Sequence, residues 1–151
     1  MALPVKAFLF DLNGTMIDDM HYHNKAWFHI LNDDLGANMT WDEVKSHMYG
    51  KNTELLIRVF GKDRFTLEEM NVLSVEKEKR YQAAYRPILK LIEGLAEFLA
   101  VSKNKNISMG IGSAAIPFNI NFVLDELDLR HYFDSIVSAD DVLESKPDPE
   151  T

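Results

Sequence analysis

A short apolar run that ends on an acidic residue constrains the fold of this chain more than any other feature. Residues 5–10 are almost entirely apolar, and Asp11, Asn13 and Gly14 follow directly. An apolar run this short indicates a strand rather than a helix, and the lack of polar alternation predicts a strand buried on both faces of a parallel sheet. Gly14 permits the turn by which the chain leaves this strand.

The next part of the chain, from about residue 19 to residue 87, is predicted to be helical throughout. Two segments, TWDE at 40–43 and TLEE at 66–69, have the capping-box pattern that opens a helix. Pro87 ends the last helix, because proline disfavours helical backbone at the residue before it. Apolar side chains recur at helical spacing before Gly36, which is placed to end the first helix: Trp27, Ile30, Leu31 and Leu35.

After Pro87 the pattern alternates between helix and strand. Segments 107–112 and 133–138 read as short strands, and Pro117 lies near the start of the helix between them. We therefore expect an α/β fold with a doubly wound, Rossmann-like parallel sheet. The expected core domain comprises residues 1–18 and 88–151 and is incomplete, while residues 19–87 form an inserted helical domain. Two apolar stripes mark the expected core helices: Leu91, Leu95, Phe98 and Leu99, then Ile116, Ile120, Val123, Leu124 and Leu127.

Three residues suited to chemistry, Asp11, Ser113 and Lys146, fall after strands or in the terminal turn of this core. Ligands of such sheets bind outside the carboxyl ends of the strands. Asp11 can act as a nucleophile or a ligand of a divalent cation, or can simply stabilise a turn. Ser113 can bind an anion together with the amides at a helix start, or serve only as a helix cap. Lys146 can neutralise a phosphate and a carboxylate, or be a solvated surface charge.

Composition excludes several classes of protein. The net charge of −8 without any basic run argues against nucleic acid as a partner. The chain contains no cysteine, so a disulfide framework and a thiol nucleophile are ruled out. The N-terminus lacks the pattern of a signal peptide, and no run approaches the roughly 18 apolar residues of a membrane span. A cytoplasmic protein is expected.

His21, His23 and His29 lack the partners of a transition-metal site, so they are expected on the helix surface or in a cleft.

The ordered set of motifs is more specific than any one of them. A strand followed by Asp11-x-Asn13-Gly-Thr, a strand ending in Ser113, and then Lys146-Pro-Asp-Pro resemble the first three motifs of the haloacid dehalogenase superfamily. The helical insert resembles the four-helix cap of its β-phosphoglucomutase-like branch. The segments HYHNKAW at 21–27 and Gly50-Lys51 add to that likeness, which covers essentially the whole chain.

The resemblance implies a role for each residue at the strand ends. Asp11 would take the phosphoryl group as an aspartyl phosphate, and its carboxylate and the main-chain carbonyl of Asn13 would bind Mg²⁺. Ser113 and the amide of Ala114 would hold the phosphate, while Lys146 would fix Asp11 and neutralise developing charge. Asn13 also occupies the position of the family's acid/base aspartate, and an amide cannot transfer that proton.

The resemblance further implies a set of substrate-facing residues in the helical insert: His23, Gly50, Lys51 and Asn52. The function expected is that of a Mg²⁺-dependent phosphatase, a monomer acting on a small phosphorylated metabolite such as a sugar phosphate. A β-phosphoglucomutase-type mutase is the alternative, and it would need basic residues in the insert to grip a second phosphate; Lys51 is the candidate. The alternative from another class is a binding module for phosphorylated ligands that has lost turnover.

Two parts of the family pattern are missing from this chain. The family's fourth motif, an acidic pair that completes the Mg²⁺ site, would lie after residue 151. The resembling fold has two more strands, one of them beside the first strand, so one sheet edge and an apolar helix face would be uncovered here. We therefore expect the chain to be a fragment of a longer protein.

Overall fold

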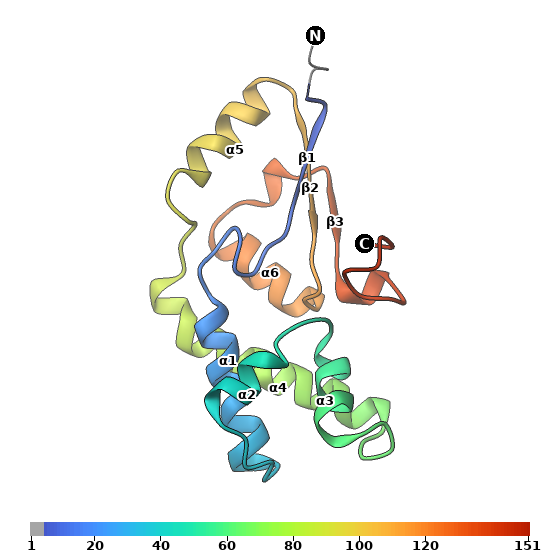
Figure 1. The fold of residues 1–151 in the computed structure, drawn as a ribbon. Coiled ribbons are helices and arrows are strands. Elements are labelled where there is room, and N and C mark those ends of the chain that lie inside the picture. The colour runs from blue at the N-terminus through green and yellow to red at the C-terminus, as the bar shows by residue number, and fades with distance from the viewer. Residues whose placement is uncertain (1–4) are drawn as a thin grey trace. The chain divides into compact units, whose positions relative to one another are not determined.

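The computed structural model describes residues 5–151, so the first four residues of the expected 1–18 segment lie outside it. The chain divides into two compact units (Figure 1). The first, termed the α/β unit, comprises Met1–Asp18 and Leu89–Thr151; the second, termed the helical unit, comprises Asp19–Ile88. The helical unit is thus a single insertion between the first strand and the rest of the α/β unit.

Three parallel strands form the sheet of the α/β unit, in the order β1-β2-β3. They are β1 (Ala7–Phe10), β2 (Ser108–Gly112) and β3 (Ser135–Val137). Helix α5 (Leu95–Asn104) precedes β2, and helix α6 (Pro117–Glu126) connects β2 to β3. The α/β class with a parallel sheet is therefore confirmed. Because the strand order advances in one direction, right-handed connections place α5 and α6 on the same face of the sheet.

Only one face of β1 is packed, which corrects the prediction of a strand buried on both faces. Phe8 and Phe10 lie against Phe98 of α5, with ring centroids 5.0 and 6.2 Å apart. Leu9 points to the opposite face and is 87% exposed. The apolar run reads as fully buried because Leu9 is as apolar as its neighbours, but no helix of the described chain covers its face.

Two helix starts in the α/β unit differ from the sequence prediction. Leu91 does not belong to α5: it pairs with Ile17 in an isolated bridge, and the helix begins at Leu95 after Gly94, whose φ is 80°. Pro117, expected near the start of α6, is its first residue, with Ile116 as the N-cap. The predicted helix start directly after Ser113 is therefore wrong by a few residues, because Pro117 suits the first helical position.

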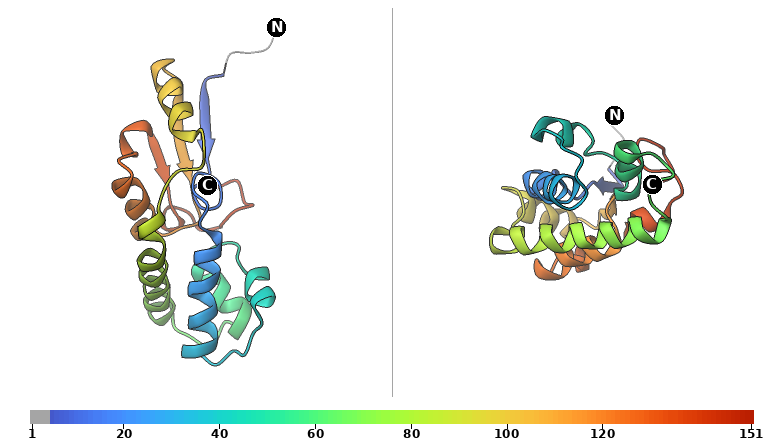
Figure 2. Two further views of the ribbon diagram at one scale, coloured as in Figure 1. Left: turned by 90° about the vertical axis from the view of Figure 1, so that its left-hand side faces the viewer. Right: turned by 90° about the horizontal axis from the view of Figure 1, so that it is seen from below.

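The helical unit contains four α-helices (Figure 2). They are α1 (Met20–His29), α2 (Trp41–Ser46), α3 (Asn52–Phe60) and α4 (Leu67–Tyr85). A π-helical turn, Ile30–Asp34, continues α1, and a 3₁₀ turn, Arg86–Ile88, ends α4 next to Pro87 as predicted. The core of this unit consists of buried apolar side chains: Trp27, Ile30, Leu31, Val44, Leu55, Leu56 and Met70.

Both predicted capping boxes are present. Thr40 and Thr66 precede α2 and α4, and each exchanges hydrogen bonds with the glutamate three residues later, Glu43 or Glu69. Hydrogen bonds from the main-chain amide and the hydroxyl of each threonine hold the pKa of the two glutamates below its usual range. The local sequence therefore determines where these helices begin.

Candidate active site

Asp11 lies immediately after β1, at the carboxyl end of the sheet. Its Oδ1 accepts a hydrogen bond from the amide of Leu12, at 2.9 Å. The chain then turns at Gly14, whose φ of 69° is left-handed and favours glycine. The packed side chains of β1 and this turn hold the carboxylate in one place at the sheet edge, as an attacking group or a metal ligand requires.

Lys146 contacts the ends of two neighbouring strands. Its Nζ donates a hydrogen bond to Asp11 Oδ1 at 2.8 Å and to the main-chain carbonyl of Gly112, the last residue of β2, at 3.1 Å. The side chains of Lys146 and Asp11 are 37% and 44% exposed, so water and ligands can reach the pair. The structure thus brings together two predicted site residues that are 135 positions apart in the sequence.

Ser113 directly follows β2 and is buried, with 2% of its surface exposed. Its Oγ accepts a hydrogen bond from the amide of Ala115 at 3.1 Å, and its own amide donates to Val137 of β3. The hydroxyl proton of Ser113 is therefore the part of the group left for an anion. Ala114 lies between these two positions, in the loop before α6.

The residues at the end of β1 suit a hard cation only in part. Asp11 supplies a carboxylate whose Oδ2 makes no hydrogen bond within the described chain, and Asn13 supplies a main-chain carbonyl nearby in sequence. Mg²⁺ is commonly held by one or two carboxylates with water and substrate phosphate completing the set. Residues 5–151 contain no cluster of three or more acidic, histidine or cysteine side chains arranged to hold a metal. The donor types fit Mg²⁺, and water and a bound phosphate would complete the set.

A hollow of about 430 Å³ lies on the open face of the sheet. Asp11 and Lys146 form part of its wall, and Leu9 and Gly110 contribute its floor. A Cβ on Gly110 would lie 3.2 Å from the Leu9 side chain, so glycine keeps this face flat. Asp11 and Lys146 therefore border a partly apolar hollow of the described chain.

In the helical unit, His23 is buried rather than on the surface or in a cleft, the location expected for the three histidines. It is 5% exposed, and both ring nitrogens have partners: Nε2 lies 3.1 Å from Asp19 Oδ2, and Nδ1 lies 2.6 Å from Lys77 Nζ. Because an ammonium can only donate, Nδ1 accepts and Nε2 carries the proton toward Asp19. In this arrangement the ring has no nitrogen left for a ligand.

Tyr81 closes the other end of this buried arrangement. Its hydroxyl donates to Asp19 Oδ2 at 2.7 Å, and its ring stacks on His23 with centroids 3.8 Å apart. Burial, followed by the nearby charge of Asp19, raises the pKa of the Tyr81 hydroxyl far above its ordinary value. Tyr81 is therefore a neutral donor at any physiological pH.

The predicted residues at 50–52 lie at the start of α3. Gly50 has a φ of 72°, Lys51 is the N-cap, and the amide of Lys51 donates to Glu54 Oε2 at 3.0 Å. Asn52 begins the helix, and its Nδ2 donates to Glu78 Oε1 at 3.1 Å. The loop is thus fixed locally by a helix start and by a hydrogen bond to α4.

A model of the haloacid dehalogenase-like hydrolase family matches residues 8–151. The chain belongs to this family. A β-phosphoglucomutase of Bacillus subtilis is 28% identical over 97% of this chain and 66% of its own length. A fructose-1-phosphate phosphatase of Escherichia coli is 27% identical over 95% of this chain and 74% of its own length. The crystal structure of a β-phosphoglucomutase from Clostridium difficile is 30% identical, with a TM-score of 0.81 over 97% of this chain and 67% of that one.

These comparisons confirm the expected placement in the haloacid dehalogenase-like enzymes, on the β-phosphoglucomutase-like side of that family. The chain spans about two thirds of the length of the two β-phosphoglucomutases. The family's relatives include both phosphatases and a phosphomutase, so family membership alone does not choose between the two reactions.

Sequence reasoning missed four members of the buried group in the helical unit: Asp19, Lys77, Glu78 and Tyr81. The signal available in this haloacid dehalogenase-like chain was weak. Lysine and glutamate in a polar helix such as α4 are normally solvent-facing, and no periodic rule marks them as buried. Only the absence of a continuous apolar stripe on a long helix that must pack could have drawn attention to them.

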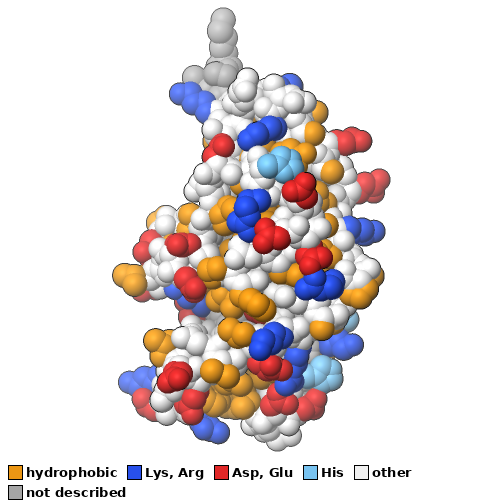
Figure 3. Space-filling view, turned by 180° about the vertical axis from the view of Figure 1, so that it is seen from behind, with side chains coloured by type: hydrophobic (Ala, Val, Ile, Leu, Met, Phe, Trp, Pro, Cys, Tyr) orange, Lys and Arg blue, Asp and Glu red, His pale blue; other side chains and the backbone are white. Residues whose placement is uncertain are grey.

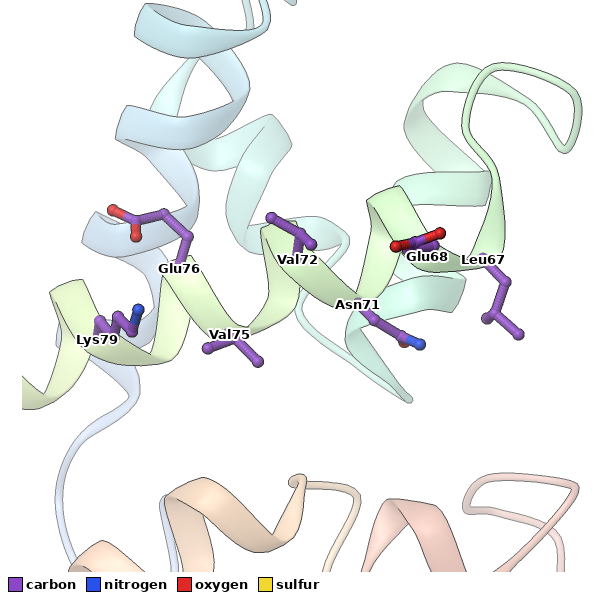
Figure 4. A pocket seen from close by; sticks show the side chains of 7 residues that line it. All are labelled: Leu67, Glu68, Asn71, Val72, Val75, Glu76 and Lys79. Atoms are coloured by element: carbon purple, nitrogen blue, oxygen red, sulfur yellow. The ribbon is translucent and has the colours of Figure 1, made fainter.

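Other surface features do not add to this site. A hollow of about 720 Å³ along α4 is lined by α4 residues alone, none of them predicted (Figure 4): Leu67, Glu68, Asn71, Val72, Val75, Glu76 and Lys79. On the face shown in Figure 3, basic and acidic side chains are interspersed. Within the described residues, every helix is too short or too polar to cross a membrane.

Proposed function

We propose that the protein is a Mg²⁺-dependent phosphatase that hydrolyses a small sugar phosphate through a phosphoryl group carried on Asp11. The contact of Lys146 with both Asp11 and the carbonyl of Gly112 carries the proposal. It puts a cation beside a strand-end carboxylate and on the carbonyl of the residue before Ser113, as transfer of an anionic group requires. The similarity to a fructose-1-phosphate phosphatase and to β-phosphoglucomutases supports the substrate class.

In the first step, Asp11 Oδ2 would attack phosphorus while Oδ1 stays bound to Lys146 and to the amide of Leu12. The bond from phosphorus to the sugar oxygen breaks, and that oxygen takes its proton from water because the Asn13 amide is not acidic enough to transfer one. The Ser113 hydroxyl would donate to a phosphate oxygen. A Mg²⁺ held by the Asp11 carboxylate and the Asn13 carbonyl would neutralise charge on the phosphate.

In the second step, a water oxygen attacks phosphorus and the bond from phosphorus to Asp11 breaks, which releases inorganic phosphate and the free carboxylate. Asn13 cannot deprotonate this water, so the step is expected to be slow. General acid–base assistance is worth roughly 10² to 10⁴-fold. Asn13→Asp should therefore raise turnover by an amount in this range, with little change in fold because the two side chains are nearly isosteric.

The decisive experiment measures inorganic phosphate released from a panel of sugar phosphates by the full-length protein with Mg²⁺, beside Asn13→Asp and Asp11→Asn. We expect release that increases in Asn13→Asp and is abolished in Asp11→Asn. Fresh protein must be checked by mass spectrometry, because Asn13-Gly14 is prone to deamidation. Equal turnover by the fresh parent and Asn13→Asp would show that Asn13 does not occupy the acid/base position.

A mutase is the second candidate, favoured by the similarity to two β-phosphoglucomutases. Glucose 6-phosphate formed from β-glucose 1-phosphate, in place of inorganic phosphate, would identify it. Asn13 favours the third possibility, a module that binds phosphorylated ligands without turnover, and neither product would then form.

We further propose that the protein is a cytoplasmic monomer that does not act on nucleic acid or membranes, in keeping with its net charge of −8.

A further inference from the structure

The loop that carries Lys146, residues 143–150, is closed by a carboxylate that the proposed reaction does not use. Glu150 Oε2 accepts hydrogen bonds from the main-chain amides of Leu143 at 3.0 Å and of Glu144 at 2.8 Å. One oxygen thus joins the end of this segment, termed the lysine loop, to its beginning. Hydrogen bonds to a charged acceptor are about twice as strong as neutral ones. Lys146 lies between the two joined points.

A tighter turn lies inside the lysine loop. The amide of Asp148 donates to the carbonyl of Ser145 at 3.1 Å, a contact that spans Lys146. Asp148 Oδ1 in turn accepts a hydrogen bond from the amide of Glu150 at 2.9 Å. The inner turn fixes the main chain around Lys146, and the Glu150 carboxylate fixes that turn to the start of the loop.

The lysine loop is also packed against the end of β2. A Cβ on Gly112 would lie only 3.0 Å from Thr151 Cγ2, so the residue after Glu150 comes close to the strand end. The carbonyl of the same Gly112 accepts the hydrogen bond from Lys146 Nζ, whose other partner is Asp11. All of these residues belong to the α/β unit. The loop therefore contacts one strand-end residue at two points, and Glu150 directly precedes one of them.

We propose that Glu150 is a positioning residue that holds the lysine loop closed and thereby keeps the Lys146 ammonium on Asp11. The lysine side chain is a flexible four-carbon stem, so the place of its ammonium depends on where the main chain is held. Without the Glu150 carboxylate, the start of the loop loses both hydrogen bonds that join it to the end. This inference rests on the proposed function, because Glu150 acts on the reaction only through Lys146.

The kinetic test compares two variants of Glu150 in the full-length protein. Glu150→Ala removes the acceptor, while Glu150→Gln keeps an oxygen that can accept both hydrogen bonds. The measured quantities are kcat and KM for phosphate release from a sugar phosphate. We expect kcat to fall about 10- to 100-fold in Glu150→Ala, with a much smaller change in KM, because a misplaced catalytic group can cost on the order of 10²-fold. Glu150→Gln should recover most of this loss.

A double variant tests whether the effect passes through Lys146. In a Lys146→Ala background, Glu150→Ala should lower kcat no further, because no ammonium remains to be misplaced. A general structural role would lower kcat in both backgrounds by the same factor, and that result would overturn the inference.

The matched control is Glu144→Ala, which removes an exposed carboxylate from the same loop and keeps the amide that Glu150 binds. Its kcat should equal that of the parent. If Glu144→Ala lowers kcat as much as Glu150→Ala does, the charge of the loop and not its closure is responsible, and the inference is wrong.

A second measurement does not depend on turnover. Acetylation of Lys146 by acetic anhydride, measured by mass spectrometry relative to the exposed Lys103, reports how firmly the Lys146 amine is held on its partners. The ratio should rise about 2- to 5-fold in Glu150→Ala, the factor that corresponds to loss of a solvent-exposed ion pair. It should stay at the parent value in Glu150→Gln and Glu144→Ala.

The two measurements separate this inference from the proposed function. If no phosphate ester is hydrolysed by the parent or by Asn13→Asp, the proposed function fails and acetylation alone decides whether Glu150 positions Lys146. An unchanged acetylation ratio in Glu150→Ala refutes the positioning whatever the activity. An active enzyme whose kcat is unchanged in Glu150→Ala refutes it as well.

Discussion

The two units of this chain contain the same ionic contact in opposite surroundings. Lys77 and Glu78 in the helical unit, and Lys146 and Asp11 in the α/β unit, are each joined by a nitrogen–oxygen distance of 2.8 Å. The first pair is almost fully buried, with side chains 3% and 2% exposed, whereas the second is 37% and 44% exposed. Distance alone therefore does not say what an ion pair does.

Surroundings decide the consequence of losing one partner. A buried charge without its partner cannot be hydrated, so the helical unit depends on its pair for stability. An exposed charge is hydrated and screened, so the α/β unit loses little stability when its pair is broken. The exposed pair should instead matter for a reacting phosphate. Removing the lysine of each pair in turn tests this contrast.

The largest effect is expected from Lys77→Met. The substitution leaves the buried Glu78 carboxylate with the neutral Asn52 amide as its hydrogen-bond donor, and breaking a buried pair costs about 3–5 kcal/mol. Urea unfolding followed by tryptophan fluorescence measures this, because both tryptophans of the chain, Trp27 and Trp41, lie in the helical unit. Lys79→Met, an exposed change on the same helix, is the control. If Lys77→Met lowers the free energy of unfolding no more than Lys79→Met does, the buried pair is no more important for stability than an exposed lysine.

Lys146→Ala should affect rate and leave stability almost unchanged. Removing a positioned cation that faces a transferring phosphoryl group costs on the order of 10²-fold in turnover, which is about 2.7 kcal/mol. The free energy of unfolding should change by less than about 0.5 kcal/mol, because the side chain is a partly exposed surface group. Lys103→Ala on α5 serves as the comparison. Near-normal turnover would show that Lys146 has no part in the reaction.

Tyr81→Phe should change the alkaline limit of stability. The pKa of Tyr81 is raised in the folded chain, so its stabilising contribution is complete below about pH 10 and declines as the pH rises beyond that value. Phenylalanine should cost about 1–3 kcal/mol at neutral pH, because Asp19 loses a donor. Above pH 10 the difference in free energy of unfolding between the parent and Tyr81→Phe should narrow. Denaturation midpoints measured from pH 7 to pH 11 would reveal a constant gap if this reasoning is wrong.

Thr66→Ala should have the smallest effect, about 1 kcal/mol from the lost helix cap of α4. Because of Glu69, the difference in stability between parent and Thr66→Ala depends on pH. Its lowered pKa contributes stability above the ordinary value near 4.5, and that stability is lost as the pH falls. The parent should therefore lose stability between about pH 5 and pH 3 more steeply than Thr66→Ala. Acid titrations of both proteins can be followed by circular dichroism. If parent and Thr66→Ala lose stability with the same slope, the capping box is not the cause of the acid sensitivity.

The parts of this fold that were predictable are those governed by neighbours in sequence. The caps at Thr40 and Thr66 and the place of Pro117 near a helix start depend on a few adjacent residues, and these predictions are confirmed. The exposure of Leu9 was not predictable, because it depends on which segment covers the second face of the sheet. The start of α5 was misplaced because Leu91 keeps the apolar spacing of the helix that follows it.

For the candidate site, the motifs named residues but not their surroundings. Sequence order placed Asp11 and Lys146 in one motif set, and the structure gives the contact between them. The sequence could not show that His23 is enclosed by charged partners from α4. In the sequence, Lys77 and Glu78 look like solvent-facing residues of a polar helix. Buried polar groups depend on long-range pairing, which a single sequence does not display.

The position of Trp27 gives this molecule an internal optical probe. Its indole is almost completely shielded from water, and the Lys77 ammonium lies 6.0 Å from the centre of the ring. The wavelength of indole fluorescence emission responds to the electric field across the ring. A change in charge among the groups around Lys77 should therefore shift the Trp27 emission spectrum even when no helix moves. In a Trp41→Phe background, one chromophore would report that field without a label.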